Sequence, residues 1–106
     1  MINIAVMGYG TVGSGVVEVI DTNGERIAQR IGDALNVKYV LDIRDFPEDP
    51  IQEKIIHDFE TIISDDEIQI VVEVMGGIEP AYTFVKRSLL AGKCAVTSNK
   101  ALVAKH

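Results

Sequence analysis

Cysteine, basic residues and long apolar runs are all scarce in this 106-residue chain, and each scarcity excludes a class of protein. The single cysteine, Cys94, cannot form an internal disulfide and fits a reducing cytoplasm. The net charge of −6 argues against nucleic acid as the main partner. No apolar run is long enough to span a bilayer, and the first residues do not resemble a signal peptide. We therefore expect a cytoplasmic protein with no membrane partner.

Apolar residues make up 47% of the chain, which is enough to bury a core in a single domain of this length. The negative charge still permits a small anionic ligand, which needs only local positive potential or aimed N–H groups. His57 and His106 are far apart and lack neighbouring ligand-type residues, so no metal site is expected. Cys94 begins an expected strand and is predicted to be a core residue rather than a nucleophile.

Expected strands and helices alternate along the chain. Short apolar runs typical of buried strands occupy residues 2–7, 37–43, 68–75 and 94–97, with an ambiguous short strand at 54–57. Helical spacing covers residues 11–32 with a break near residues 23–24, a turn at 60–63, a helix at 80–91 and the opening of another at 99–105. The polar segment 44–53, with its prolines, is expected to be a loop. This alternation predicts an α/β fold, a Rossmann-type doubly wound and mainly parallel sheet in three α/β/α layers.

The stretch VMGYGTVGSG, residues 6–15, places Gly8, Gly10 and Gly13 in G-x-G-x-x-G spacing between a strand and a helix. That context is the one a dinucleotide-binding loop requires. Gly8 would allow a sharp turn, Gly10 would let a pyrophosphate approach the backbone, and Gly13 would let the helix lie close to the strands. The N–H groups at the start of the helix would face the phosphates. Tyr9, inside the loop, would contact the cofactor or shield it.

The choice between NAD and NADP depends on the end of the second expected strand. An acidic residue there favours the ribose 2′-hydroxyl of NAD, whereas an arginine accommodates the 2′-phosphate of NADP. The segment LDIRDF offers Asp42, Arg44 and Asp45 together. Because Arg44 is nearer the strand tip and can reach outward, NADP is favoured. Use of both cofactors stays open, and so does a solvated Arg44 with no cofactor role.

Four stretches together resemble the N-terminal, nucleotide-binding part of homoserine dehydrogenase. They are GYGTVGSGVV, LDIRD, VVEVMGGIEPA and TSNKALVA, and they spread over nearly the whole chain. The combination of VEVMGG with TSNKAL is far more specific than the glycine spacing. The resemblance implies an NAD(P)-dependent oxidoreductase that interconverts L-homoserine and L-aspartate 4-semialdehyde, for the synthesis of threonine and methionine.

The resemblance also implies roles for particular residues. Arg44 would lie at the adenosine ribose, and Lys100 would match the active-site lysine of the family. The pyrophosphate would lie against Gly10, Thr11 and Val12. The cofactor crevice would be bordered by Met75, Gly76 and Gly77, with Ser98 and Asn99 near the nicotinamide.

Two further residues carry a chemical argument of their own. Lys100 follows a strand end and could donate a proton to a developing alkoxide, although a solvated lysine in a first helical turn is the alternative. Glu73 lies inside an apolar strand, so its carboxylate must be hydrogen-bonded, near the wet edge of the sheet, or protonated. We expect Glu73 to be structural rather than catalytic.

Members of the family continue into a domain that binds the substrate and mediates homodimerisation, whereas this chain stops at His106. Their second catalytic lysine and their substrate-binding carboxylates have no counterpart here. We expect an excised domain or a stand-alone relative, without turnover of its own. A non-catalytic NAD(P)-binding module, such as a redox sensor, is the second hypothesis. TSNKAL favours the dehydrogenase, because a sensor needs no lysine beside the nicotinamide.

Overall fold

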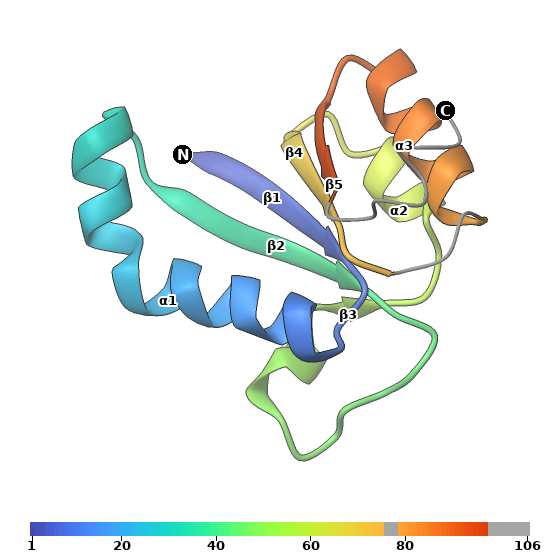
Figure 1. Cartoon of the computed structure of the whole chain (residues 1–106), viewed down its shortest axis with the longest axis horizontal. Coiled ribbons are helices and arrows are strands. Elements are labelled where there is room, and N and C mark those ends of the chain that lie inside the picture. Colours follow the sequence, from blue (N-terminus) through green and yellow to red (C-terminus); the bar gives the residue numbers. More distant parts are fainter. Residues whose placement is uncertain (76–78, 98–106) are drawn as a thin grey trace.

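A computed structural model describes residues 1–75 and 79–97 of the chain. Within them, parallel strands form one sheet in the order β3-β2-β1-β4-β5 (Figure 1). The strands are β1 (Ile2–Met7), β2 (Leu35–Leu41), β3 (Ile55–Ile56), β4 (Ile68–Glu73) and β5 (Cys94–Thr97). The predicted Rossmann-type α/β fold is therefore confirmed.

Helices cover both faces of the sheet. They are α1 (Thr11–Ile31), the 3-10 helix η1 (Pro50–Lys54), α2 (Glu60–Ile63) and α3 (Ala81–Leu90). Alternate residues of β1 enter two separate cores: Ala5 and Met7 pack toward α2 and α3, whereas Ile4 and Val6 pack toward α1 and η1. Burial on both faces explains why the strands are apolar at successive positions rather than alternating.

The helix α1 runs without interruption through Gly24, so the predicted break near residues 23–24 is wrong. A glycine inside a helix costs about 1 kcal/mol relative to alanine, which weakens a helix without ending it. The helix ends instead at Gly32, whose φ of 76° is left-handed and whose N–H donates to the carbonyl of Ala28. The last glycine of the segment, not the middle one, is the stop signal.

The strand predicted at residues 37–43 lies two residues earlier, as β2, and the strand predicted at 68–75 ends two residues early, as β4. β2 pairs with β1 from Leu35 opposite Ile2 to Leu41 opposite Met7, so both strands end at the same level. Beyond Leu41 the chain leaves the sheet, and Ile43 is 93% exposed. The predicted loop 44–53 also contains the start of η1, where the carboxylate of Asp49 accepts from the N–H of Ile51 at 2.9 Å.

Cys94 is exposed, so the prediction that it is a core residue is wrong. It begins β5, which pairs with β4 at one edge of the sheet. Apolar character alone does not separate an edge strand from a central one, because burial depends on what covers the strand.

Asp65, in the turn before β4, ties that turn to β2. Its Oδ2 accepts from the ammonium of Lys38 at 2.6 Å and from the hydroxyl of Tyr39 at 2.9 Å. Its Oδ1 accepts from the N–H of Glu67 at 2.9 Å. The hydrogen bond from Lys38 is the main reason that the pKa of Asp65 is lowered to about 2.

We expect Asp65→Asn to lower the free energy of unfolding by about 1–2 kcal/mol at neutral pH. The folded pKa of Asp65 lies below its unfolded value, so this contribution is complete above about pH 4 and is lost as pH falls toward about 2. Urea denaturation across this range checks the prediction. The stabilities of wild type and variant should converge in acid, and a gap independent of pH would contradict the assigned role.

Candidate functional site

The glycine loop between β1 and α1 is held by close backbone contacts. Gly8 has a left-handed φ of 102°, and its N–H donates to the carbonyl of Leu41 at 2.7 Å. At Gly13 an added Cβ would lie 1.9 Å from the carbonyl oxygen of Gly8. The start of α1 is therefore pressed against the end of β1, as the sequence predicts for a loop of this type.

The start of α1 offers a cradle for an anion. Gly10 is the N-cap residue and has no side chain with which to cap the first N–H groups, which leaves those of Thr11 and Val12 for a ligand. An added Cβ at Gly10 would meet open space, in contrast to Gly13. This bare, positively polarised helix end fits a pyrophosphate, and a side chain at position 10 would fill it.

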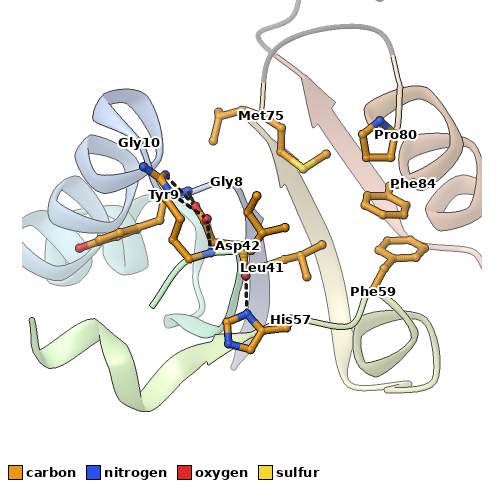
Figure 2. Close-up of a pocket in the computed structure, with 13 residues that line it drawn as sticks. Gly8, Tyr9, Gly10, Leu41, Asp42, His57, Phe59, Met75, Pro80 and Phe84 are labelled. Atoms are coloured by element: carbon orange, nitrogen blue, oxygen red, sulfur yellow. Dashed lines mark hydrogen bonds and ion pairs between the residues drawn. The ribbon is translucent and has the colours of Figure 1, made fainter. Parts of the chain in front are cut away.

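A cleft of about 440 Å³ opens at the carboxyl ends of β1, β2 and β4 (Figure 2). β1 pairs with β2 on one side and β4 on the other, so this is where the order of the parallel strands reverses. Folds of this class bind their ligands at such a switch point. The lining residues are Gly8, Tyr9, Gly10, Leu41, Asp42, Ile43, Arg44, His57, Phe59, Val74, Met75, Pro80 and Phe84.

One wall of the cleft is aromatic and apolar. The rings of Phe59 and Phe84 stack with their centroids 4.1 Å apart, and Pro80 and Met75 lie beside them in Figure 2. The loop before α2 supplies Phe59 and α3 supplies Phe84, so this wall comes from two segments that no motif connects. An apolar wall with a few polar groups opposite is typical of a small-molecule site.

The carboxylate of Asp42 is the polar centre of the opposite wall. Its Oδ2 accepts from the N–H of Tyr9 at 2.8 Å and from Nη2 of Arg44 at 3.0 Å. Its Oδ1 accepts from the backbone N–H and from Nε of Arg44, at 2.9 and 3.0 Å. The bond from the Arg44 side chain is the main cause that lowers the pKa of Asp42 to about 2. The side chain of Asp42 is only 6% exposed, so its carboxylate interacts with neighbours within the chain rather than with solvent.

Arg44 itself remains accessible, with 58% of its side chain exposed. Its guanidinium lies 5.2 Å from the ring centroid of Phe46, which in turn contacts the ring of Tyr9 edge to face. The hydroxyl of Tyr9 donates to Asp49 at 3.2 Å, so its ring braces the segment that carries Arg44. Tyr9 therefore lines the cleft mainly through its backbone, with the hydroxyl end pointing away (Figure 2).

His57 lies at the rim of the cleft, directly after β3. Its Nδ1 is 2.7 Å from the carbonyl oxygen of Asp42, and its Nε2 is 2.9 Å from Oδ1 of Asp45. These contacts, the one to the Asp42 backbone foremost, raise the pKa of His57. Sequence reasoning weighed His57 only as a metal ligand, because nothing local shows that β3 lies beside β2.

Glu73 is completely buried at the end of β4. It accepts from the N–H of Met75 at 2.6 Å and from the hydroxyl of Thr97 at 2.5 Å. Of the three alternatives expected for this carboxylate, hydrogen bonding is the one that the structure shows. These bonds link the ends of β4 and β5 and shape the backbone at Met75, which borders the cleft.

The structure brings several of the predicted cofactor residues together around one cleft and leaves others undescribed. Gly8, Tyr9, Gly10, Arg44 and Met75 line the cleft, whereas Thr11, Val12 and Gly13 form the adjoining first turn of α1. The other predicted site residues, Gly76, Gly77, Ser98, Asn99 and Lys100, lie outside the described residues.

Two features are absent from the described part of the chain, residues 1–75 and 79–97. No group of His, Cys, Asp and Glu side chains there could hold a metal ion. None of its helices is long and apolar enough to cross a membrane.

The matching family model and the most similar known proteins name one family. Residues 8–106 match the model of the homoserine dehydrogenase NAD-binding domain. Homoserine dehydrogenase of Helicobacter pylori is 40% identical over 99% of this chain and 25% of its own length. For that of Corynebacterium glutamicum the identity is 42%, over 99% of this chain and 24% of its own length. The crystal structure of the Thiobacillus denitrificans homoserine dehydrogenase superposes with a TM-score of 0.90 at 35% identity, covering 98% of this chain and 25% of that one.

The chain spans about a quarter of the length of the curated relatives it matches. The match runs from the first glycine of the loop to the last residue, so it includes every segment of the cleft. The family model describes a domain that binds a nicotinamide dinucleotide, which is the ligand that the helix end and the switch-point cleft fit. This chain belongs to the homoserine dehydrogenase family and corresponds to its NAD-binding domain.

Proposed function

We propose that this chain is the cofactor-binding domain of a homoserine dehydrogenase. The enzyme would interconvert L-homoserine and L-aspartate 4-semialdehyde in the cytoplasm, for the synthesis of threonine and methionine. The family match over residues 8–106 carries the proposal, together with the bare helix end at the cleft. The substrate site and the dimer contacts would lie in the part of the relatives that this chain does not cover.

The nicotinamide, when bound, supplies the hydride exchange with the substrate carbon. The chain's own residues bind and orient the dinucleotide. The N–H groups of Thr11 and Val12 would hold the pyrophosphate above Gly10, and the backbone at Met75 would border the cofactor. Gly76, Gly77, Ser98 and Asn99 would extend that border toward the nicotinamide. Lys100 would donate a hydrogen bond or proton to the substrate oxygen.

We further propose that NADP is preferred over NAD. A carboxylate offers about four acceptor positions, and Asp42 already accepts four hydrogen bonds within the chain. The hydroxyls of an NAD ribose would therefore compete with Arg44 and the loop backbone for Asp42. Arg44 uses Nε and Nη2 on Asp42, which leaves Nη1 for a phosphate. The half-exposed guanidinium favours a 2′-phosphate at this wall.

We expect Arg44→Ala to weaken NADP binding about tenfold or more while changing NAD binding less than about threefold, because a charge-assisted bond to phosphate is lost. Calorimetric titration of both cofactors measures the difference. Arg26→Ala removes an exposed charge from α1 and is the control for net charge. Equal losses for NAD and NADP would show that Arg44 acts through the fold.

The proposed reaction is tested with a full-length protein that carries this domain. NADPH oxidation with L-aspartate 4-semialdehyde should be robust, and Lys100→Ala should lower kcat strongly while cofactor affinity changes little. An unchanged kcat would remove Lys100 from the chemistry. Binding of a dinucleotide without any turnover would favour a non-catalytic module instead.

A further inference from the structure

The cleft wall that carries Arg44 holds a second group able to carry positive charge. His57 lines the same cleft, and Figure 2 shows its ring directly below Asp42. About half of the side chain is exposed, at 51%, so the ring can exchange protons with solvent. The position of His57 follows from the pairing of β3 with β2, which sets Ile56 opposite Leu41. The residues that follow these two, His57 and Asp42, therefore lie side by side.

Both ring nitrogens of His57 face atoms that can only accept hydrogen bonds. Nδ1 meets the carbonyl oxygen of Asp42, and Nε2 meets the carboxylate of Asp45. A neutral imidazole has one N–H and can satisfy only one of these contacts. Both contacts are satisfied as hydrogen bonds only when the ring is protonated, as an imidazolium ion.

The charged groups around the His57 ring lie in the segment that follows β2 and in the segment that follows His57 itself. Asp45 contacts Nε2 and also accepts from the amide of Gln52, while the carboxylate of Asp42 is turned to Arg44 and Tyr9. Asp58, the residue that follows His57, accepts from the backbone N–H of Glu60 at the start of α2. The nearest anion, Asp45, is neutralised by His57 only while the ring is protonated.

We propose that His57 is a specificity-determining residue, whose imidazolium form acts with Arg44 to favour a 2′-phosphorylated dinucleotide over an unphosphorylated one. The inference rests on the proposed function and adds a pH dependence to the choice of cofactor. Protonated His57 adds a cation to this wall and pairs with Asp45. When the proton is lost, the cation disappears and Asp45 becomes an unpaired anion beside the phosphate site. Both changes weaken the binding of a 2′-phosphate and leave the binding of an uncharged 2′-hydroxyl unchanged.

Thermodynamic linkage supplies a direct test. If protonation of His57 strengthens binding of the 2′-phosphate by some factor, bound phosphate must strengthen proton binding by His57 by the same factor and so raise its pKa by the logarithm of that factor. The pH profile of NADP affinity alone does not isolate this effect, because a phosphate monoester itself titrates near pH 6. The titration of the His57 ring must therefore be read separately.

The first experiment follows the histidine ring signals of the chain by proton NMR as pH is varied. The sequence has two histidines, so His106→Gln assigns the signal of His57. Saturating 2′,5′-ADP should raise the pKa of His57 by about half a unit to one unit, a coupling of about three- to tenfold. Saturating 5′-ADP, which lacks the 2′-phosphate, should leave it nearly unchanged. Equal His57 pKa values with the two ligands would overturn the inference.

The second experiment compares wild type with His57→Gln by calorimetry. Glutamine keeps an N–H donor for the carbonyl of Asp42 but cannot carry charge. We expect wild type to bind NADP about three- to tenfold more tightly than the variant near pH 6 and about equally near pH 8.5, with NAD binding alike throughout. An NADP ratio that does not change with pH would overturn the inference and leave the proposed function standing. Failure of wild type to bind any dinucleotide would instead overturn the proposed function.

Discussion

Gly13→Ala is expected to lower the free energy of unfolding by at least about 3 kcal/mol, a large fraction of the stability of a small domain. The new Cβ would lie 1.9 Å from the carbonyl oxygen and 2.9 Å from the carbonyl carbon of Gly8. Both are backbone atoms, so no side-chain rotation relieves the clash. The first turn of α1 would have to move away from β1, which opens the core around Val17.

Gly15→Ala is the matched control in the same helix. A Cβ there meets open space, and alanine is a better helix former than glycine. This variant should therefore gain about 0.5–1 kcal/mol, the opposite sign to Gly13→Ala two residues earlier. Urea denaturation followed by circular dichroism measures both. A Gly13→Ala protein as stable as wild type would contradict the close packing of loop and helix.

Gly10→Val is expected to keep the fold and to lose dinucleotide binding by at least about a hundredfold. Its Cβ meets open space, and its backbone, with φ −88° and ψ −154°, is extended and accessible to a β-branched residue. The isopropyl group would occupy the cradle in front of the first N–H groups of α1. A ligand there would lose both the close approach to the backbone and the polarised helix end.

Calorimetric titration of Gly10→Val with NADP(H) and NAD(H) tests this loss, with thermal unfolding as the measure of the fold. Gly24→Val places the same side chain in open space farther along α1 and controls for a β-branched residue in the helix. Its affinity should equal that of wild type. If Gly10→Val also binds both cofactors like wild type, the pyrophosphate does not lie at this helix end.

Local pattern alone predicted the alternation of strands and helices and the glycine loop of this protein, although not every boundary. Apolar runs and helical spacing are properties of neighbouring residues, so the segments of β1, α2 and β5 could be predicted closely. The glycine loop was predictable for the same reason, since its strand, turn and helix follow one another directly. The resemblance that led to the family also lies in short contiguous stretches.

Only the tertiary structure decided which groups meet at the cleft. The partner of Arg44 is the buried carboxylate of Asp42, His57 reaches the same wall because β3 pairs with β2, and Phe84 closes the other wall from α3. The ends of β2 and β4 were set by their pairing with β1, not by the composition of either strand. Strand pairing joins residues far apart in sequence, and its stability comes from burial on both faces of the sheet. A local pattern contains no information about those partners, so the contacts between the residues that line the cleft could be identified only in the folded chain.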